Sequence, residues 1–257
     1  MGFDFEEHCY TASVNGKPAK PAAGVTSIIK ETLGLDQRLA NWMVKEAHDF
    51  MIDGIAPYVD GNETIQITRS LFEKLCKDAK GAHRKKSKDA TDIGTVAHDF
   101  AEKTLKQISV EMPANLLARN AAEAFLQWTT LTKLEPIDIE RMVFSEKWWY
   151  AGTCDYYGKI DGKLAVLDLK TSSGLYREMP LQLAAYAVAL EEETGETIEQ
   201  GWIIRLCKKT GNCEPYPIPL TKRLKDDWML VRGAHRALGR LETTIKLAKE
   251  NLYAECR

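Results

Sequence analysis

Hydrophobic and polar positions near the N-terminus predict a β-hairpin followed by a short helix. The stretch CYTASVNGKPAK places Asn15 and Gly16 between two short extended runs, and this dipeptide is typical of a two-residue hairpin turn. The next stretch, VTSIIKETLG, has the pattern of a short helix. We expect Thr26 or Ser27 to be its N-cap and Gly34 to lie just beyond its C-terminus.

Helical periodicity dominates the following part of the chain. Apolar residues recur three and four positions apart over residues 36–53 and again over 68–80, so the first ~90 residues should be mostly helical. Another helix is predicted to open with Thr91 or Asp92 as its N-cap. Pro113 then suits the first position of a further helix.

The period changes after Pro136. Residues 137–150 alternate between apolar and polar as a strand does, and a hairpin follows. Residues 179–195 have the pattern of an amphipathic helix that ends at a glycine, and residues 200–220 that of two strands around a turn. A long helix is predicted for residues 222–252. This order of elements predicts an α/β fold with a small mixed sheet flanked by helices.

The hairpin GTCDYYGKIDGKLAVLDLKTSS contains two aspartates, although acidic residues are uncommon in strands. Asp161-Gly162 is a favoured two-residue turn, and in its register Asp155 faces Asp168. Facing Cβ atoms lie about 5 Å apart, so the carboxylates repel unless a proton or a cation lies between them. Lys170 projects from the same face as Asp168.

Three interpretations of this pattern compete. The hairpin could present polar residues to solvent, or Lys170 could be a structural counter-ion for two exposed acids. The third interpretation is a divalent-metal site with a lysine beside it, because Mg²⁺ binds one or two carboxylates together with waters and phosphate. The continuous apolar run Ala165-Val166-Leu167 argues against simple exposure, since it is typical of a strand covered on both faces.

Positive charge gathers between Lys74 and Lys88. A solvated helix end and loop would explain such a run, and the run leads directly into the predicted helix at Asp92. On that helix Thr95, His98 and Glu102 fall on one face.

Four short motifs resemble, in order, those of the PD-(D/E)XK nuclease superfamily. The match is to its RecB-like branch, with the related phage-type exonucleases and the mitochondrial genome maintenance exonuclease. GTVAHDFAE resembles the first motif, AGTCD the second, VLDLKTSS the third and QLAAY the Gln-x-x-x-Tyr motif, all within roughly residues 90–190. GVTSIIK is similar, more weakly, to the N-terminal part of such phage exonucleases. Asp-x-Lys alone is a weak signal, whereas the ordered set is a specific one.

The resemblance implies a metal site and a set of catalytic groups. It assigns His98, Asp155 and Asp168 as ligands of Mg²⁺ or Mn²⁺, and Lys170 as the catalytic lysine beside the two aspartates. Gln182 and Tyr186 are implied to lie on one helical face, near the substrate or Lys170.

Further candidates surround this set. Glu102 and Glu146 could lie just outside the metal ligands, although Glu102 could instead only pair with Lys106, and Glu146 could be a plain strand-end residue. Contacts to DNA are expected from a larger group of polar residues: Lys80, Arg84, Lys85, Lys86, Lys88, Thr171 and Ser172.

The cysteines do not fit the iron–sulfur members of the superfamily. The chain has six cysteines but no C-x-x-C pair, so we expect no iron–sulfur cluster. Cys154 occupies the position of the proline that names the superfamily, and the RecB-like branch usually lacks that proline.

The implied fold is a restriction-endonuclease-like core with a small central mixed sheet flanked by helices. We expect a mostly helical region at 1–88 packed on the core, the nuclease core at 89–220, and a C-terminal helix of the same domain at 221–257. Residues 1–85 and 220–257 carry little of the resemblance, so substrate choice would be decided there.

Composition and charge limit the classes of function. The net charge is −2, so any positive surface for nucleic acid must be local. The chain has neither an apolar run of about 20 residues nor a signal-peptide pattern, so we expect a cytoplasmic protein with reduced thiols and no membrane partner.

The hypothesis from sequence is a divalent-metal-dependent DNA exonuclease of phage or bacterial recombination, repair or processing. DNA is the expected partner, and the resemblance suggests a single-strand annealing or other recombination protein as a second one. A structure-specific endonuclease and a non-catalytic DNA- or protein-binding relative are the alternatives. A metallohydrolase built on His98 and Glu102 has less support, because the chain lacks His-Glu-x-x-His. Polarity, strand preference, the number of metal ions and oligomeric state stay open.

Overall fold

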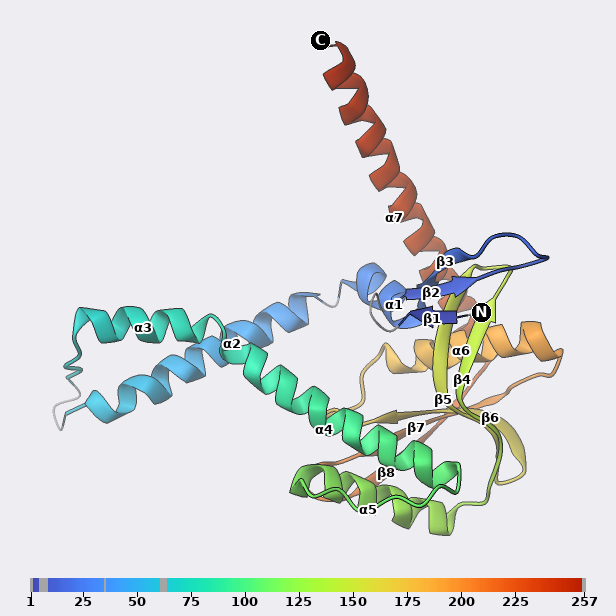
Figure 1. Cartoon of the computed structure of the whole chain (residues 1–257), viewed down its shortest axis with the longest axis horizontal. Coiled ribbons are helices and arrows are strands. Elements are labelled where there is room, and N and C mark those ends of the chain that lie inside the picture. Colours follow the sequence, from blue (N-terminus) through green and yellow to red (C-terminus); the bar gives the residue numbers. More distant parts are fainter. Residues whose placement is uncertain (1, 5–8, 35, 61–63, 256–257) are drawn as a thin grey trace. The chain divides into compact units, whose positions relative to one another are not determined.

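The computed structural model describes residues 2–4, 9–34, 36–60 and 64–255 (Figure 1). The chain divides into two compact units, one of Met1–Leu33 with Val96–Arg257 and the other of Gly34–Thr95. The N-terminal strands and the first helix thus group with the later sheet.

The first unit contains the sheet and most of the helices. Its strands are β1 (Gly2–Asp4), β2 (Cys9–Ala12), β3 (Lys20–Gly24), β4 (Leu134–Ser145), β5 (Tyr150–Ile160), β6 (Lys163–Lys170), β7 (Gln200–Leu206) and β8 (Cys213–Pro219). Its helices are α1 (Val25–Leu33), α5 (Leu116–Leu131), α6 (Met179–Thr194) and α7 (Lys222–Glu255).

The second unit is helical. It contains α2 (Asp36–Ile55), the 3₁₀ turn η1 (Ala56–Tyr58), α3 (Arg69–Ala79) and the first part of α4 (Ala82–Leu105), whose last part belongs to the first unit. α2 and α3 approach closely at Gly54, where an added Cβ would lie 2.8 Å from Leu75 Cδ2. Lys86 of α4 forms an ion pair with the buried Glu46 of α2.

The sheet is mixed. Its strand order is β1-β2-β3-β5-β6-β7-β8, with β4 paired to β5. β3 lies parallel to β5, and β6 lies parallel to β7, whereas the other neighbours are antiparallel. The arrangement confirms the predicted α/β class with a central mixed sheet flanked by helices.

The N-terminal hairpin turns where the sequence predicted. Asn15 and Gly16 have φ of 54° and 71°, and the Lys17 N–H donates to the Val14 carbonyl across 3.1 Å. These are the left-handed conformations that a primed turn requires, and asparagine and glycine adopt them at least cost. The hairpin then joins the central sheet, because β3 continues beside β5.

Three helix starts differ from prediction. α1 begins at Val25, so Thr26 and Ser27 lie within its first turn and are not its N-cap. α4 begins at Ala82, well before Thr91 and Asp92, because its alanine, lysine and arginine residues favour helix and no breaker interrupts them.

The helix predicted to open at Pro113 is α5, which begins at Leu116. The Asn115 Oδ1 atom accepts hydrogen bonds from the backbone N–H groups of Leu117 and Ala118, at 2.9 and 3.2 Å. An asparagine N-cap satisfies two otherwise unpaired donors, which a proline start does not do.

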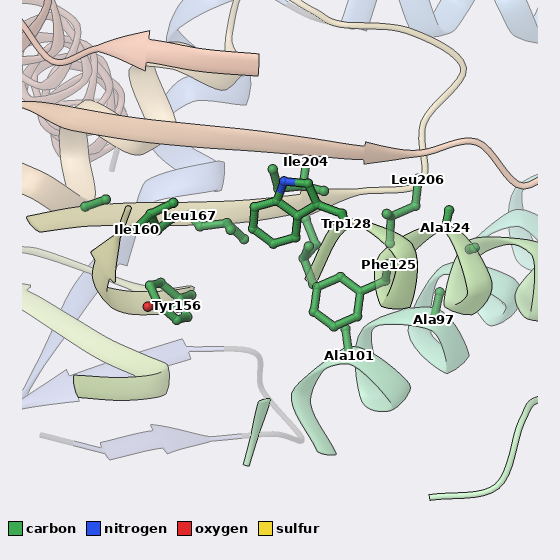
Figure 2. Packing of buried hydrophobic residues seen from close by; sticks show 13 residues of the cluster. Ala97, Ala101, Ala124, Phe125, Trp128, Tyr156, Ile160, Leu167, Ile204 and Leu206 are labelled. Atoms are coloured by element: carbon green, nitrogen blue, oxygen red, sulfur yellow. The ribbon is translucent and has the colours of Figure 1, made fainter. Parts of the chain in front are cut away.

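A hydrophobic cluster holds α4 and α5 against one face of the sheet (Figure 2). Leu167 and Leu169 of β6 point into this cluster. Because strand side chains alternate between faces, Asp168 and Lys170 project from the opposite face. The buried members are Ala97, Ala101, Ala121, Ala124, Phe125, Trp128, Tyr156, Ile160, Ala165, Leu167, Leu169, Ile204 and Leu206.

Helix α6 lies over the other face. Lys170 reaches Gln182 of this helix, and Gly201 of β7 lets it approach the sheet, since an added Cβ would lie 2.9 Å from Leu183 Cδ1. α6 ends as predicted at Gly195, whose φ of 74° and N–H bond to the Glu191 carbonyl close the last turn. Among the described residues, no helix is long and apolar enough to cross a membrane.

Candidate active site

The hairpin of β5 and β6 has the register that its turn predicted, but the pairing is shorter. Pairing starts with Ile160 opposite Lys163 and ends with Tyr156 opposite Leu167. The predicted facing pair of aspartates therefore lies one step past the last paired residues.

Past the last paired residues, the Asp155 carboxylate accepts a hydrogen bond that a backbone carbonyl would accept in a regular hairpin. In a continuing ladder the Leu169 N–H would bond the carbonyl of Cys154. It donates instead to Asp155 Oδ2 across 2.5 Å. The bond fixes the Asp155 carboxylate beside the strand that carries Asp168.

A cavity of about 300 Å³ opens where the two strands stop pairing. It brings together six of the residues predicted from the sequence: His98, Asp155, Asp168, Lys170, Gln182 and Tyr186. The other residues that line it are Tyr10, Val25, Thr26, Glu140, Gly152 and Thr153.

A chain of polar contacts crosses the cavity from β6 to α6. The Lys170 ammonium forms an ion pair with Asp168 and donates a hydrogen bond to Gln182 Oε1 at 3.2 Å. Gln182 Nε2 in turn donates to the hydroxyl of the buried Tyr186 at 2.6 Å. The amide thus holds the ammonium in one place, and the tyrosine fixes the orientation of the amide.

Gly152 of the AGTCD motif makes room for that tyrosine. A Cβ at this position would lie 2.8 Å from Tyr186 Cε1 and 3.0 Å from Val25 Cγ2. The motif therefore needs glycine for close packing, in addition to its aspartate.

His98 enters from α4. Its Nδ1 atom lies 3.7 Å from Asp155 Oδ2, and its side chain is one-third exposed (33%). The neighbouring Ala97 and Ala101 are buried in the hydrophobic cluster, which anchors this part of the helix.

The two aspartates impose an electrostatic cost on each other. Burial and the charge of Asp168 raise the pKa of Asp155 to about 6. Burial alone would lower the pKa of Lys170, but the charges of Asp168 and Asp155 outweigh burial and raise it. The cavity thus favours a positive charge beside its carboxylates, and the Lys170 ammonium supplies one.

The sequence reasoning missed Glu140, which lines the same cavity. On β4, Ile139 pairs with Tyr156 and Arg141 with Cys154, so Glu140 lies opposite Asp155. The sequence indicated only that Glu140 falls within the predicted strand of residues 137–150. Its register could not be counted, because the β4–β5 pairing shifts between Pro136 and Asp138.

Other predicted residues lie apart from the cavity lining. Glu102 forms an ion pair with Lys106 at 2.6 Å, and Glu146 lines a different cavity with Glu192 and Glu193. Thr171 and Ser172 lie in the loop after β6. The remaining DNA-binding candidates, all in the second unit, are Lys80, Arg84, Lys85, Lys86 and Lys88.

The oxygen and nitrogen atoms that line the cavity are of the types that a hard divalent cation binds. Two carboxylates and an imidazole, with room for water, suit Mg²⁺ or Mn²⁺. Among the described residues, no group of three histidine, cysteine, aspartate or glutamate side chains is arranged so that it could hold a metal ion in this conformation. The Lys170 ammonium forms an ion pair with Asp168.

Comparison with known proteins finds structural similarity at low sequence identity. No family model matches the chain, and no curated protein matches it. A crystal structure of a candidate exonuclease from Eubacterium rectale is similar over 60% of this chain and 68% of that one, with 16% identity and a TM-score of 0.42. The structure of SSO0001 covers 54% and 85% of the two chains, with 16% identity and a TM-score of 0.23. Both similarities are between backbone structures and say nothing of function.

Proposed function

We propose that this chain is a divalent-metal-dependent deoxyribonuclease, and that it acts as an exonuclease on phosphodiester bonds. The observation that carries the proposal is the meeting of Asp155, Asp168, Lys170 and His98 in one cavity, with Gln182 holding the lysine. A binding module would have no use for the buried Asp168 and the partly buried Asp155, which repel each other beside a positioned ammonium.

His98, Asp155 and Asp168 would hold the cation. When bound, Mg²⁺ or Mn²⁺ supplies Lewis acidity toward a phosphoryl oxygen and lowers the pKa of a water ligand. Its charge also offsets the repulsion that raises the pKa of Asp155.

Lys170 would act through its charge. As an ammonium, Lys170 suits hydrogen bonding to phosphoryl oxygens. Gln182 would keep the ammonium directed at the phosphate, and the Tyr186 hydroxyl would keep the amide from rotating.

DNA would be bound through its backbone. The basic residues between Lys74 and Lys88 are candidates for phosphate contacts, and such binding weakens steeply with added salt. Recombination, repair or DNA processing is the proposed setting, with a single-strand annealing protein as a partner class.

The decisive experiment uses end-labelled single- and double-stranded DNA. Wild-type protein is incubated with Mg²⁺, Mn²⁺ or a chelator, beside the Lys170→Ala variant. We expect metal-dependent release of label by the wild type and loss of cleavage in the variant. Normal cleavage by the variant, or no cleavage by the wild type with either ion, would overturn the proposal. Labelled circular DNA separates exonuclease from endonuclease action, since only an endonuclease cuts a closed strand.

A further inference from the structure

Glu140 is an acidic residue of the cavity that none of the recognised motifs contains. Its side chain is half-buried and, among the described side chains, makes no hydrogen bond or ion pair. Glu102 differs in this respect, since its carboxylate is neutralised by Lys106.

The β4–β5 register places Glu140 beside Asp155. The pairs Ile139–Tyr156 and Arg141–Cys154 lie on either side of these two positions. Glu140 flanks Asp155 from β4, on the side away from β6, which carries Asp168. Asp155, Asp168 and Glu140 all line the same cavity.

The backbone at Glu140 is held in an uncommon conformation. Its φ is 55°, in the left-handed region that glycine and asparagine adopt more readily than glutamate. Such a residue costs on the order of 1 kcal/mol or more, and strained residues of this kind gather at functional sites.

We propose that Glu140 supplies a further carboxylate to the divalent-cation site, next to Asp155. The inference rests on the proposed function, because it concerns the cation of that same site. It adds an anionic oxygen donor to the set of His98, Asp155 and Asp168, and oxygen donors favour Mg²⁺ and Mn²⁺ over softer ions.

The electrostatics of the cavity agree with this placement. Burial and the charge of Asp155 raise the pKa of Glu140 to about 7.

The test is a calorimetric titration with Mn²⁺ in mildly alkaline, chelator-free buffer. The proteins are wild type, Glu140→Gln, Asp155→Asn and a matched control, Glu146→Gln. Glu146 lies just beyond β4 and lines a second cavity that Glu140 also borders, but it does not line the cavity that holds the two aspartates. We expect Glu140→Gln to weaken Mn²⁺ binding by at least about tenfold, since even residues that only support metal ligands contribute that much. Asp155→Asn should nearly abolish binding, and Glu146→Gln should match the wild type.

A second variant guards against a folding defect. Glu140→Gly relieves the left-handed backbone, so its metal-free melting temperature should equal or exceed that of the wild type. It should nevertheless bind Mn²⁺ about as weakly as Glu140→Gln.

The outcomes separate the two proposals. Wild-type affinity in both Glu140 variants, with weak binding in Asp155→Asn, overturns the role of Glu140 and leaves the nuclease proposal standing. A wild-type protein that binds no Mn²⁺, or an Asp155→Asn variant that binds it normally, overturns the cation site itself.

Discussion

The Leu169 N–H donates to Asp155 Oδ2 across 2.5 Å, at the position where a regular hairpin would offer it a backbone carbonyl. The Asp155 side chain thereby ends the pairing of β5 with β6 and still gives the Leu169 N–H a hydrogen-bond acceptor. The bond also fixes the Asp155 carboxylate near the buried Asp168, whose charge contributes to raising the pKa of Asp155 to about 6.

The raised pKa of Asp155 predicts a pH-dependent stability of the metal-free protein. A raised carboxyl pKa means that the folded state binds the proton more tightly than the unfolded state, so stability falls as pH rises from about 4 to 6. Asp155→Asn cannot ionise yet still offers an oxygen to the Leu169 N–H. Its stability relative to wild type should therefore rise across this range, by up to about 3 kcal/mol.

Chemical denaturation in chelator at several pH values measures this difference. The control is Asp99→Asn, which changes an exposed acid of α4 paired with Lys103. A wild type and Asp155→Asn variant that keep the same difference at every pH would contradict the electrostatic account. Saturating Mg²⁺ should stabilise the wild type much more than the variant.

Lys170→Met should separate catalysis from metal binding. Methionine keeps an unbranched apolar stem and removes the ammonium that pairs with Asp168. We expect a loss of cleavage rate of about 10²–10³-fold, the scale of removing one electrostatic contact to a transition state. Mn²⁺ affinity, measured by calorimetry, should stay equal or rise, because the competing ammonium is gone.

Gln182→Leu serves as the companion to that variant. It removes both the acceptor for Lys170 and the donor to Tyr186 while keeping a similar volume. Its rate should fall less than that of Lys170→Met, since the ammonium remains but is no longer held. A Gln182→Leu protein that cleaves DNA at the wild-type rate would show that the hydrogen bond from Lys170 to Gln182 has no role in cleavage.

Much of this site could be read from local sequence because its key geometry is local. The Asp161-Gly162 turn sets the register of β5 and β6, and the alternation of β6 assigns Asp168 and Lys170 to one face. Glu140 could not be found in this way. Its position depends on a register shift in β4 and on pairing with a strand that follows a separate turn.

The fold shows the same limit. Element types followed from periodicity, whereas the parallel pairing of β3 with β5 joins segments more than 120 residues apart in the chain and left no local signal. The start of α4 was missed for a different reason, since Thr91 and Asp92 are good caps that here lie inside a continuous helix.

Gly152→Ala should disturb the site through packing alone. The added methyl group would lie 2.8 Å from Tyr186 Cε1, and both this tyrosine and Val25 on the other side are buried. Overpacking of this kind costs about 1–3 kcal/mol, and displacement of Tyr186 should also lower the cleavage rate. Gly174→Ala is the matched control, because a Cβ there meets no atom within 4 Å. Equal melting temperatures for the two variants would contradict the close approach of Tyr186.

The basic residues of the second unit should govern the salt dependence of DNA binding. Arg84, Lys85 and Lys88 are exposed, whereas Lys86 is committed to Glu46 and is left unchanged. Replacing the three by glutamine should weaken binding and lower the slope of log K against log salt by about 0.7–0.9 for each lost phosphate contact. Fluorescence anisotropy with labelled DNA over a salt series, in chelator to prevent cleavage, measures the slope.

The control triple variant changes Lys222, Lys246 and Lys249 of α7. An equal slope for the wild type and the Arg84, Lys85 and Lys88 variant would show that these residues do not contact the backbone. A reduced slope in the α7 variant instead would place the DNA contacts on that helix.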